Sequence, residues 1–219
     1  MIRYRKFFLP SARVCAKIKG QRVVLRDVSP VVGPTLSFFV RSTAGKGRQS
    51  MYQIGALLFY GETGVCRVAD IQVRSPGRGE PERSYYVLEP LYQSCTITTP
   101  VDSDKVFMRP ILTREEADAL IDRIPRIKAQ GFYSRALREL TGHYQAALKT
   151  HDCQAYLELT MSIYAKKQFA ESRKRKFGQV DARFMKRAEN LLYGEFSVAL
   201  GIPFDDVQAY IAERVSKKV

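Results

Sequence analysis

The sequence predicts an α+β protein, in which a small antiparallel β-barrel is followed by an all-α helical bundle. Two observations lead to this prediction. Between residues 52 and 110, short apolar or alternating runs are separated by turn residues, as at Gly61–Gly64 and Ser75–Gly79. From Leu112 onwards, apolar residues instead recur at the spacing of amphipathic helices. The chain therefore changes from strands to helices near its middle.

The strands are predicted from four runs with β-branched, aromatic or alternating apolar residues. These runs are Ala56–Tyr60, Val65–Val73, Tyr85–Leu88 and Cys95–Thr99. Several short strands with a turn every few residues indicate a small antiparallel barrel of five strands and not a βαβ fold.

The helical half begins with a capping box formed by Thr113 and Glu116. Further apolar stripes begin at Leu137, Tyr156 and Val180. Gly201 is placed to end the longest of these helices, and Pro203 to begin the last one. The pattern predicts a compact bundle of about five helices.

The net charge of +14 is spread unevenly along the chain. Residues 1–50 carry +10, residues 51–130 carry −1 and residues 131–219 carry +5. A strongly basic segment favours nucleic acid as a partner. The neutral middle third therefore indicates a separate part with a different partner.

Residues 1–50 lack the pattern of a folded domain, because they contain one acidic residue, Asp27, and no sustained periodicity of apolar residues. One interpretation is a basic arm that binds phosphate backbones. The other is that translation begins at Met51, since Gly45–Arg48 can be encoded by a purine-rich run resembling a ribosome-binding site. We expect the second.

Several function classes are disfavoured by what the sequence lacks. It has no run of 18 apolar residues that could span a membrane. Its four cysteines are isolated, which argues against a disulfide framework or a metal site and fits a reducing cytoplasm. We expect all four to be buried as small apolar residues. His143 and His151 have no neighbouring nucleophile or carboxylate pair. We expect no enzyme, no cofactor and no small-molecule substrate.

Short segments in a particular order resemble the CarD family of bacterial transcription regulators, whose first domain also occurs in the transcription-repair coupling factor. The segments are Met51–Gly55, Phe59–Tyr60, Gly64–Val65, Tyr85–Leu88, Pro100–Asp102, Arg109–Ile111, Thr113–Glu116 and Lys186–Leu192 followed by Gly194–Glu195. The resemblance covers about 165 residues and both predicted parts.

The resemblance implies an SH3/Tudor-like barrel at residues 51–111 that binds the β subunit of RNA polymerase. A linking helix and connector at 112–131 and a helical domain at 132–219 would follow, and residues 1–50 would be an extension. The helical domain would contact promoter DNA and tune the stability of the open complex. Such a protein is cytoplasmic and associates with the nucleoid through the polymerase.

Polymerase-binding residues implied by the resemblance lie at two strand ends. Arg74 matches an arginine that the family uses, and arginine pairs well with carboxylates across interfaces. Thr98 stands where several relatives have a second arginine, so we expect a less electrostatic contact there. Thr99 and Pro100 complete this predicted site.

A basic cluster in the helical half is the predicted DNA-binding site. Only Glu171 and Asp181 oppose its nine cationic residues, and contacts of this kind bind phosphates without choosing a sequence. The cluster comprises Lys166, Lys167, Arg173, Lys174, Arg175, Lys176, Arg183, Lys186 and Arg187.

The chain contains no tryptophan, although many relatives insert one into the minor groove four residues before a tyrosine. Counting back from Tyr144 gives Leu140 as a possible wedge. Leu140 also lies on the apolar stripe of its own helix, so packing in the core is the alternative. Phe132 and Tyr133 are other candidates.

A second function class remains open from the sequence. Small β-barrels also bind RNA or the ribosome, and the basic total charge would suit that role.

Overall fold

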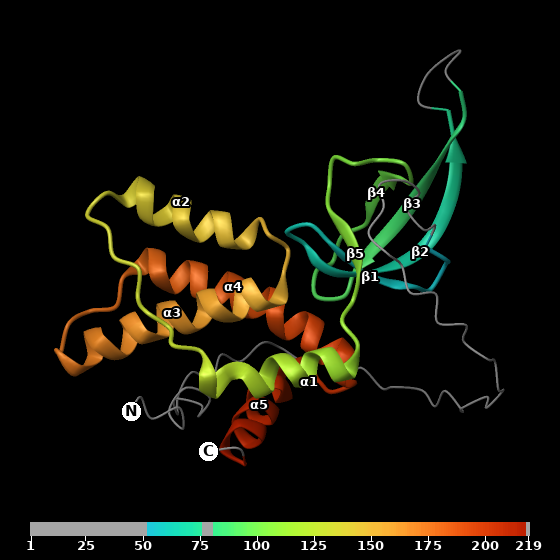
Figure 1. Ribbon diagram of the computed structural model, residues 1–219. Coiled ribbons are helices and arrows are strands. Elements are labelled where there is room, and N and C mark those ends of the chain that lie inside the picture. The colour runs from blue at the N-terminus through green and yellow to red at the C-terminus, as the bar shows by residue number, and fades with distance from the viewer. Residues whose placement is uncertain (1–51, 76–80, 218–219) are drawn as a thin grey trace. The chain divides into compact units, whose positions relative to one another are not determined.

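The computed structural model describes residues 52–75 and 81–217, in which strands come first and helices second (Figure 1). The predicted α+β class is therefore confirmed. The expectations for residues 1–50 lie outside the described residues. The strands are β1 (Leu57–Tyr60), β2 (Gly64–Arg74), β3 (Arg83–Pro90), β4 (Ile97–Pro100) and β5 (Met108–Pro110).

All pairings in this sheet are antiparallel, in the order β4-β3-β2-β1-β5. The barrel that the sequence predicts is not closed, because β4 and β5 form opposite edges with no ladder between them in the described chain. These edge strands span only four and three residues, which leaves few backbone groups for closure. Strand β5 was not predicted from its pattern, since three residues are too few to show alternation.

Both faces of the sheet are covered where β1 and β2 pair, because alternate residues point to opposite sides of a strand. Leu58 and Val68 lie in a small core within the sheet, together with Tyr86. Phe59 and Val65 instead join the core of the helices. The sheet and the helices therefore share apolar contacts in addition to their covalent connection.

The helices follow the predicted stripes and caps. They are α1 (Arg114–Arg123), α2 (Leu137–Leu148), α3 (Cys153–Ser172), α4 (Gln179–Leu200) and α5 (Val207–Ser216), with short 3-10 helices η2 (Ile124–Arg126) and η3 (Phe204–Asp206). Both hydrogen bonds of the predicted capping box are present. Gly201 ends α4 in the left-handed conformation, with a φ of 65°.

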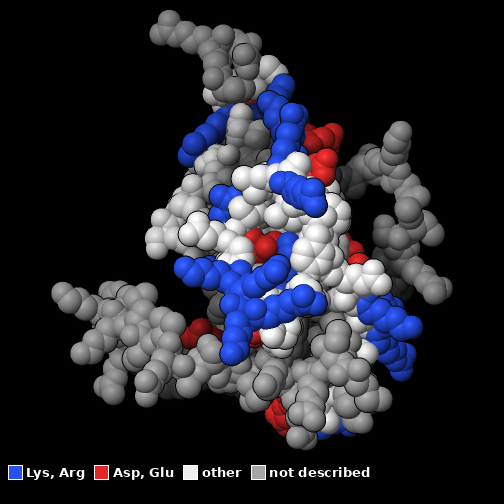
Figure 2. Space-filling view, turned by 90° about the vertical axis from the view of Figure 1, so that its left-hand side faces the viewer, with Lys and Arg blue, Asp and Glu red and all other residues white. Residues whose placement is uncertain are grey.

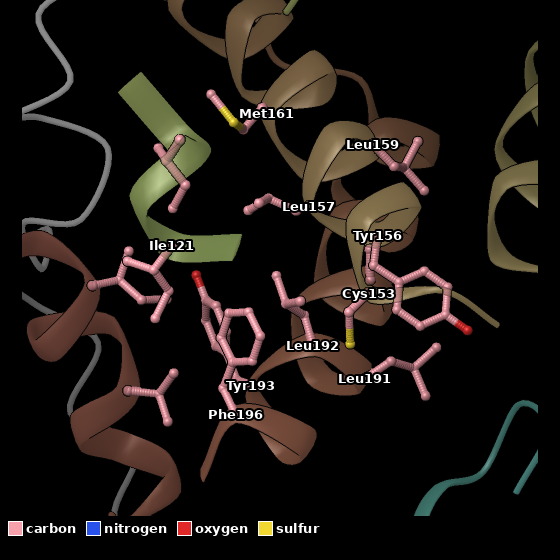
Figure 3. Close-up of a cluster of buried hydrophobic side chains, with 14 of the residues drawn as sticks. Ile121, Cys153, Tyr156, Leu157, Leu159, Met161, Leu191, Leu192, Tyr193 and Phe196 are labelled. Carbon is pink, nitrogen blue, oxygen red and sulfur yellow. The ribbon is translucent and has the colours of Figure 1, made fainter. Parts of the chain in front are cut away.

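The helical core is formed by side chains from several helices that point toward one another. Figure 3 shows Ile121 of α1 facing Leu157 of α3 and Leu192 of α4, all of them buried. Phe196, also buried, packs in the same cluster. Helix α4 is central to this arrangement because it also contacts β2 and α5.

Two expectations about side-chain burial need correction. Leu137 was expected on a buried stripe but is 60% exposed, because it lies in the first turn of α2, beyond the end of the core. Cys66 and Cys153 are buried as expected, whereas Cys95 is exposed in the connection before β4. Cys15 lies outside the described residues.

Candidate functional sites on the sheet and the helices

The predicted polymerase-binding residues lie near one end of the sheet. Arg74, the last residue of β2, pairs in register with Arg83, the first residue of β3. Pro100 of β4 pairs with Tyr85, two residues further along β3. The register therefore places Arg74 and Pro100 on either side of the beginning of β3.

Strand β4 is an edge strand, so one side of its backbone has no partner strand among the described residues. Thr98 is exposed there, whereas Thr99 is buried opposite Tyr86. The Val101 N–H bonds to the Ser84 carbonyl, and two residues earlier in this register the backbone of Thr99 points toward Tyr86 as well. Thr98 is therefore the residue whose backbone faces the open edge. An open edge of this kind can be extended by a strand from another protein.

Eight of the nine predicted DNA-binding residues are at least partly exposed in the structure. Arg173–Lys176 are exposed in the turn between α3 and α4, and Arg183 and Lys186 are exposed on α4. Lys167 is partly buried. Arg187 is half-exposed and forms an ion pair with Glu62 in the β1–β2 turn.

Lys166 does not belong to the exposed cationic surface, which corrects its assignment to DNA. It is 8% exposed, and its Nζ lies 2.6 Å from Asp181 Oδ1 and donates to the Tyr144 hydroxyl at 2.9 Å. Tyr144 in turn donates to Asp181 at 2.6 Å. Burial and the contact with Asp181 raise the pKa of Tyr144, so its hydroxyl stays protonated. A spacing pattern could not reveal that this lysine has an internal partner.

Leu140 occupies the core position that was the alternative to a wedge. It is 9% exposed and packs in the cluster that contains Tyr144 and Leu148. A side chain in this position has no apolar surface to insert between base steps without opening the bundle. The burial favours the packing interpretation.

A buried ion pair between the sheet and α4 was missed by the sequence prediction. Glu195 of α4 is fully buried and accepts two hydrogen bonds from the guanidinium of Arg109 on β5, one of them 2.7 Å long at Nη2. It also accepts from the backbone N–H of Leu112 at 2.9 Å. Burial alone would lower the pKa of Arg109, but the hydrogen bonds and charge of Glu195 outweigh it and raise this pKa.

Three further contacts complete this sheet–helix junction. The guanidinium of Arg109 lies 4.4 Å from the ring centroid of Phe59 and donates to the His151 carbonyl at 3.0 Å. The Cys153 thiol donates to Glu195 at 2.9 Å, and burial raises its pKa well above the ordinary value. Glu195 interrupts a run of buried residues on α4, and a charge within such a run was the available signal for a buried partner.

His151 lies where the turn between α2 and α3 meets the sheet. Its φ is 54°, and its ring stacks on Phe107 with 5.0 Å between centroids. Within the described part of the chain, its Nδ1 is buried with no hydrogen-bond partner. Burial lowers the pKa of His151; the charge of Arg109 also lowers it, while Glu62 and a hydrogen bond to the Gly61 backbone act in the opposite direction.

Residues 52–112, which include the sheet with its open edge, match the family model described as the CarD-like/TRCF RID domain. This segment belongs to the CarD-like/TRCF RID family. RID domains interact with RNA polymerase, so the protein has a role connected with transcription. The family that the sequence resembles is thereby confirmed for the RID segment, whereas the helices after residue 112 lie outside the match. No curated protein matches the chain.

Metal sites and membrane spans are both absent from the described ranges. No group of three or more His, Cys, Asp or Glu side chains within residues 52–75 and 81–217 is placed to hold a metal ion. In the same ranges, no helix has both the length and the apolar composition that a membrane span requires.

Glu195→Gln is predicted to destabilise the protein by about 3–5 kcal/mol, because the Arg109 charge would lose its buried counter-charge. Chemical denaturation measures this loss. Glu89→Gln is the matched control, since the Arg67–Glu89 ion pair has side chains 55% and 46% exposed. The control should change stability by about 1 kcal/mol or less. Equal effects of the two substitutions would contradict the assigned role of the junction.

Stability is predicted to fall as the pH drops below about 6.5, partly through His151. The unfolded chain takes up this proton at the ordinary pKa of 6.5, whereas the folded chain takes it up only at lower pH. The folded state is therefore favoured above pH 6.5, and this contribution is lost as the pH falls through the lowered folded-state pKa. His151→Asn, which tolerates a positive φ, should flatten the dependence in denaturation curves recorded across this range. An unchanged slope would remove His151 as a source.

Proposed function

We propose that this protein is a non-enzymatic regulator of transcription initiation. In this proposal the RID sheet binds the β subunit of RNA polymerase, and the helical part contacts promoter DNA and alters the stability of the open complex. The observation that carries the proposal is the RID match over a sheet whose β4 edge is open in the described chain.

The β4 edge and Arg74 support one continuous polymerase-binding surface. The edge can pair with a strand of the β subunit, and exposed Arg74 can receive a carboxylate at the neighbouring end of β2. Main-chain pairing would supply affinity, and the arginine would supply orientation. Thr98 would lie against the added strand, which fits the less electrostatic contact expected at this position.

The exposed cations of the helical part support the DNA contact. Figure 2 shows Lys and Arg side chains gathered over the end of the molecule that lies at the left of Figure 1, where α3 ends. Arg173–Lys176 continue the chain from α3 into α4 at this end. Contacts with phosphates position a protein on duplex DNA and add affinity without sequence choice.

Arg74→Glu is predicted to weaken binding to a bacterial β-subunit fragment by about tenfold or more, because it places a negative charge opposite an acidic partner. Arg126→Glu makes the same charge change at an exposed position in η2 and should have little effect. Affinity is measured by titration, and melting curves check that both variants fold. Equal affinities for the two variants would exclude Arg74 from the interface.

A polymerase pull-down tests the proposed function as a whole. Capture of RNA polymerase by the full chain should persist after nuclease treatment, because the proposed contact is between proteins. Loss of polymerase on nuclease treatment would instead indicate tethering through nucleic acid and would contradict the proposal.

Replacing Arg173, Lys174, Arg175 and Lys176 by Gln is predicted to lower the slope of log affinity for duplex DNA against log salt. The expected change is about 0.9 for each phosphate that the variant no longer neutralises. A control removes the same number of charges from the sheet and its β4–β5 connection, at Arg67, Arg74, Arg83 and Lys105. An unchanged slope in the first variant, or equal changes in both, would show that the turn does not contact DNA.

A further inference from the structure

Three large apolar side chains of the helical part remain exposed, and they lie at one end of α2 and α3. Tyr133 is 61% exposed, Leu137 is 60% exposed and Phe169 is 47% exposed. Leu137 is the first residue of α2, Tyr133 precedes it in the connection from η2, and Phe169 lies near the end of the antiparallel neighbour α3 (Figure 1). The rings of Tyr133 and Phe169 meet edge to face at 6.4 Å between centroids. We call these two rings the aromatic patch.

The aromatic patch is held in place although it is exposed. Lys166 Nζ lies 5.1 Å from the Tyr133 ring centroid, and the guanidinium of Arg173 lies 4.9 Å from that of Phe169. The segment before Tyr133 is fixed as well, because Ser162 donates to the Gln130 carbonyl at 2.7 Å and Phe132 stacks on His143. Fixed rings bind a planar partner with a smaller loss of entropy than mobile ones.

Cationic residues flank both rings of the aromatic patch along the chain. Residues 132–139 and 169–176 together contain six Lys or Arg and two Glu. One of these glutamates, Glu139, accepts a hydrogen bond from Ser134 at 2.7 Å. Exposed aromatic rings among basic residues are the arrangement on which unpaired bases stack while the cations follow the phosphates.

The backbone conformation at Lys174 is one that glycine adopts more readily than lysine, so the lysine here has a steric cost. Arg175 N–H bonds to the Ala170 carbonyl and Lys174 N–H to that of Glu171, which ends α3 with a left-handed residue, Lys174, at a φ of 54°. Helix α4 ends in the same way, but with Gly201. Glycine is the residue that adopts this conformation without steric cost. Helix α3 therefore carries a lysine where its backbone favours glycine.

We propose that the aromatic patch binds unpaired bases of DNA by stacking, with Arg173–Lys176 holding the adjacent phosphates. This proposal rests on the proposed DNA contact and adds that the protein distinguishes melted from paired DNA. Bases in an intact duplex are stacked on one another and cannot meet these rings, so the patch would engage only where strands have separated.

The test compares a fully paired duplex with the same duplex carrying a short unpaired bubble that contains 2-aminopurine. The chain has no tryptophan, so the fluorescence of 2-aminopurine can be followed without indole background. The full-length protein should bind the bubble more tightly than the duplex and quench the fluorophore. The double variant Tyr133→Leu, Phe169→Leu should lose about tenfold in affinity for the bubble and lose the quenching. Its duplex affinity and salt slope should not change.

A control variant matches the chemical change and the exposure. Phe107→Leu replaces a ring that is 46% exposed in the sheet part, and it should leave bubble binding unchanged. Tyr133→Phe keeps a ring at the first patch position and should retain the quenching. Melting curves of all variants exclude misfolding as the cause of a loss.

The outcomes separate this proposal from the duplex contact. Equal binding of bubble and duplex by the unaltered protein would overturn the stacking proposal and leave the phosphate contact standing. Failure to bind either DNA would overturn both. If the double variant lost affinity for polymerase without any change on DNA, the aromatic patch would belong to a protein interface, and the proposal would be wrong.

Discussion

The ion pair between Arg109 and Glu195 connects the RID sheet to the helices. Glu195 is fully buried, and its carboxylate accepts from Arg109 and from the Leu112 backbone. A buried carboxylate is costly unless its hydrogen bonds are made, so the two elements are stable only when docked in the register that makes them. The β4 edge and the cationic turn are thereby held in a fixed relation to each other, as the proposed contacts with polymerase and DNA would require.

Helix α4 faces the sheet with residues 186–195, the segment on which the family resemblance of the helical half rests. Arg187 pairs with Glu62, and Glu195 pairs with Arg109. At Gly194 a Cβ atom would approach the Tyr92 ring to 3.0 Å, and the Tyr92 hydroxyl donates to the Gly194 carbonyl. These three positions of the segment are explained by docking on the sheet, although Arg187 was first assigned to DNA.

The sequence was sufficient for much of the fold. Helices were predictable because their stripes are long and because caps such as Thr113 and Gly201 mark their ends. The closure of the sheet was not predictable, since it depends on pairing between short edge strands that are distant along the chain. Strand β5 illustrates the same limit, because three residues cannot display a period.

The candidate sites were harder to predict, because a charge pattern does not reveal which charges find partners inside the protein. Lys166 looks like a surface residue in the sequence, yet it pairs with Asp181, and Glu195 carries a signal of burial that does not name its partner Arg109. Leu137 shows the converse, an apolar residue on a regular stripe that remains exposed beyond the core. In each case the position of the neighbouring element decides the outcome, and that position is a property of the tertiary structure.

The left-handed lysine at the end of α3 has a consequence for how this protein can vary. Selection for stability alone would favour glycine at position 174, since glycine relieves the backbone at no cost to the core. A stabilising substitution at this site would also remove a positive charge from the turn. Saturation mutagenesis of position 174 screened for thermal resistance should therefore recover Lys174→Gly, and this gain in stability would remove a charge from the cationic surface. At this position the stability of the fold favours glycine, whereas the proposed phosphate contact favours lysine.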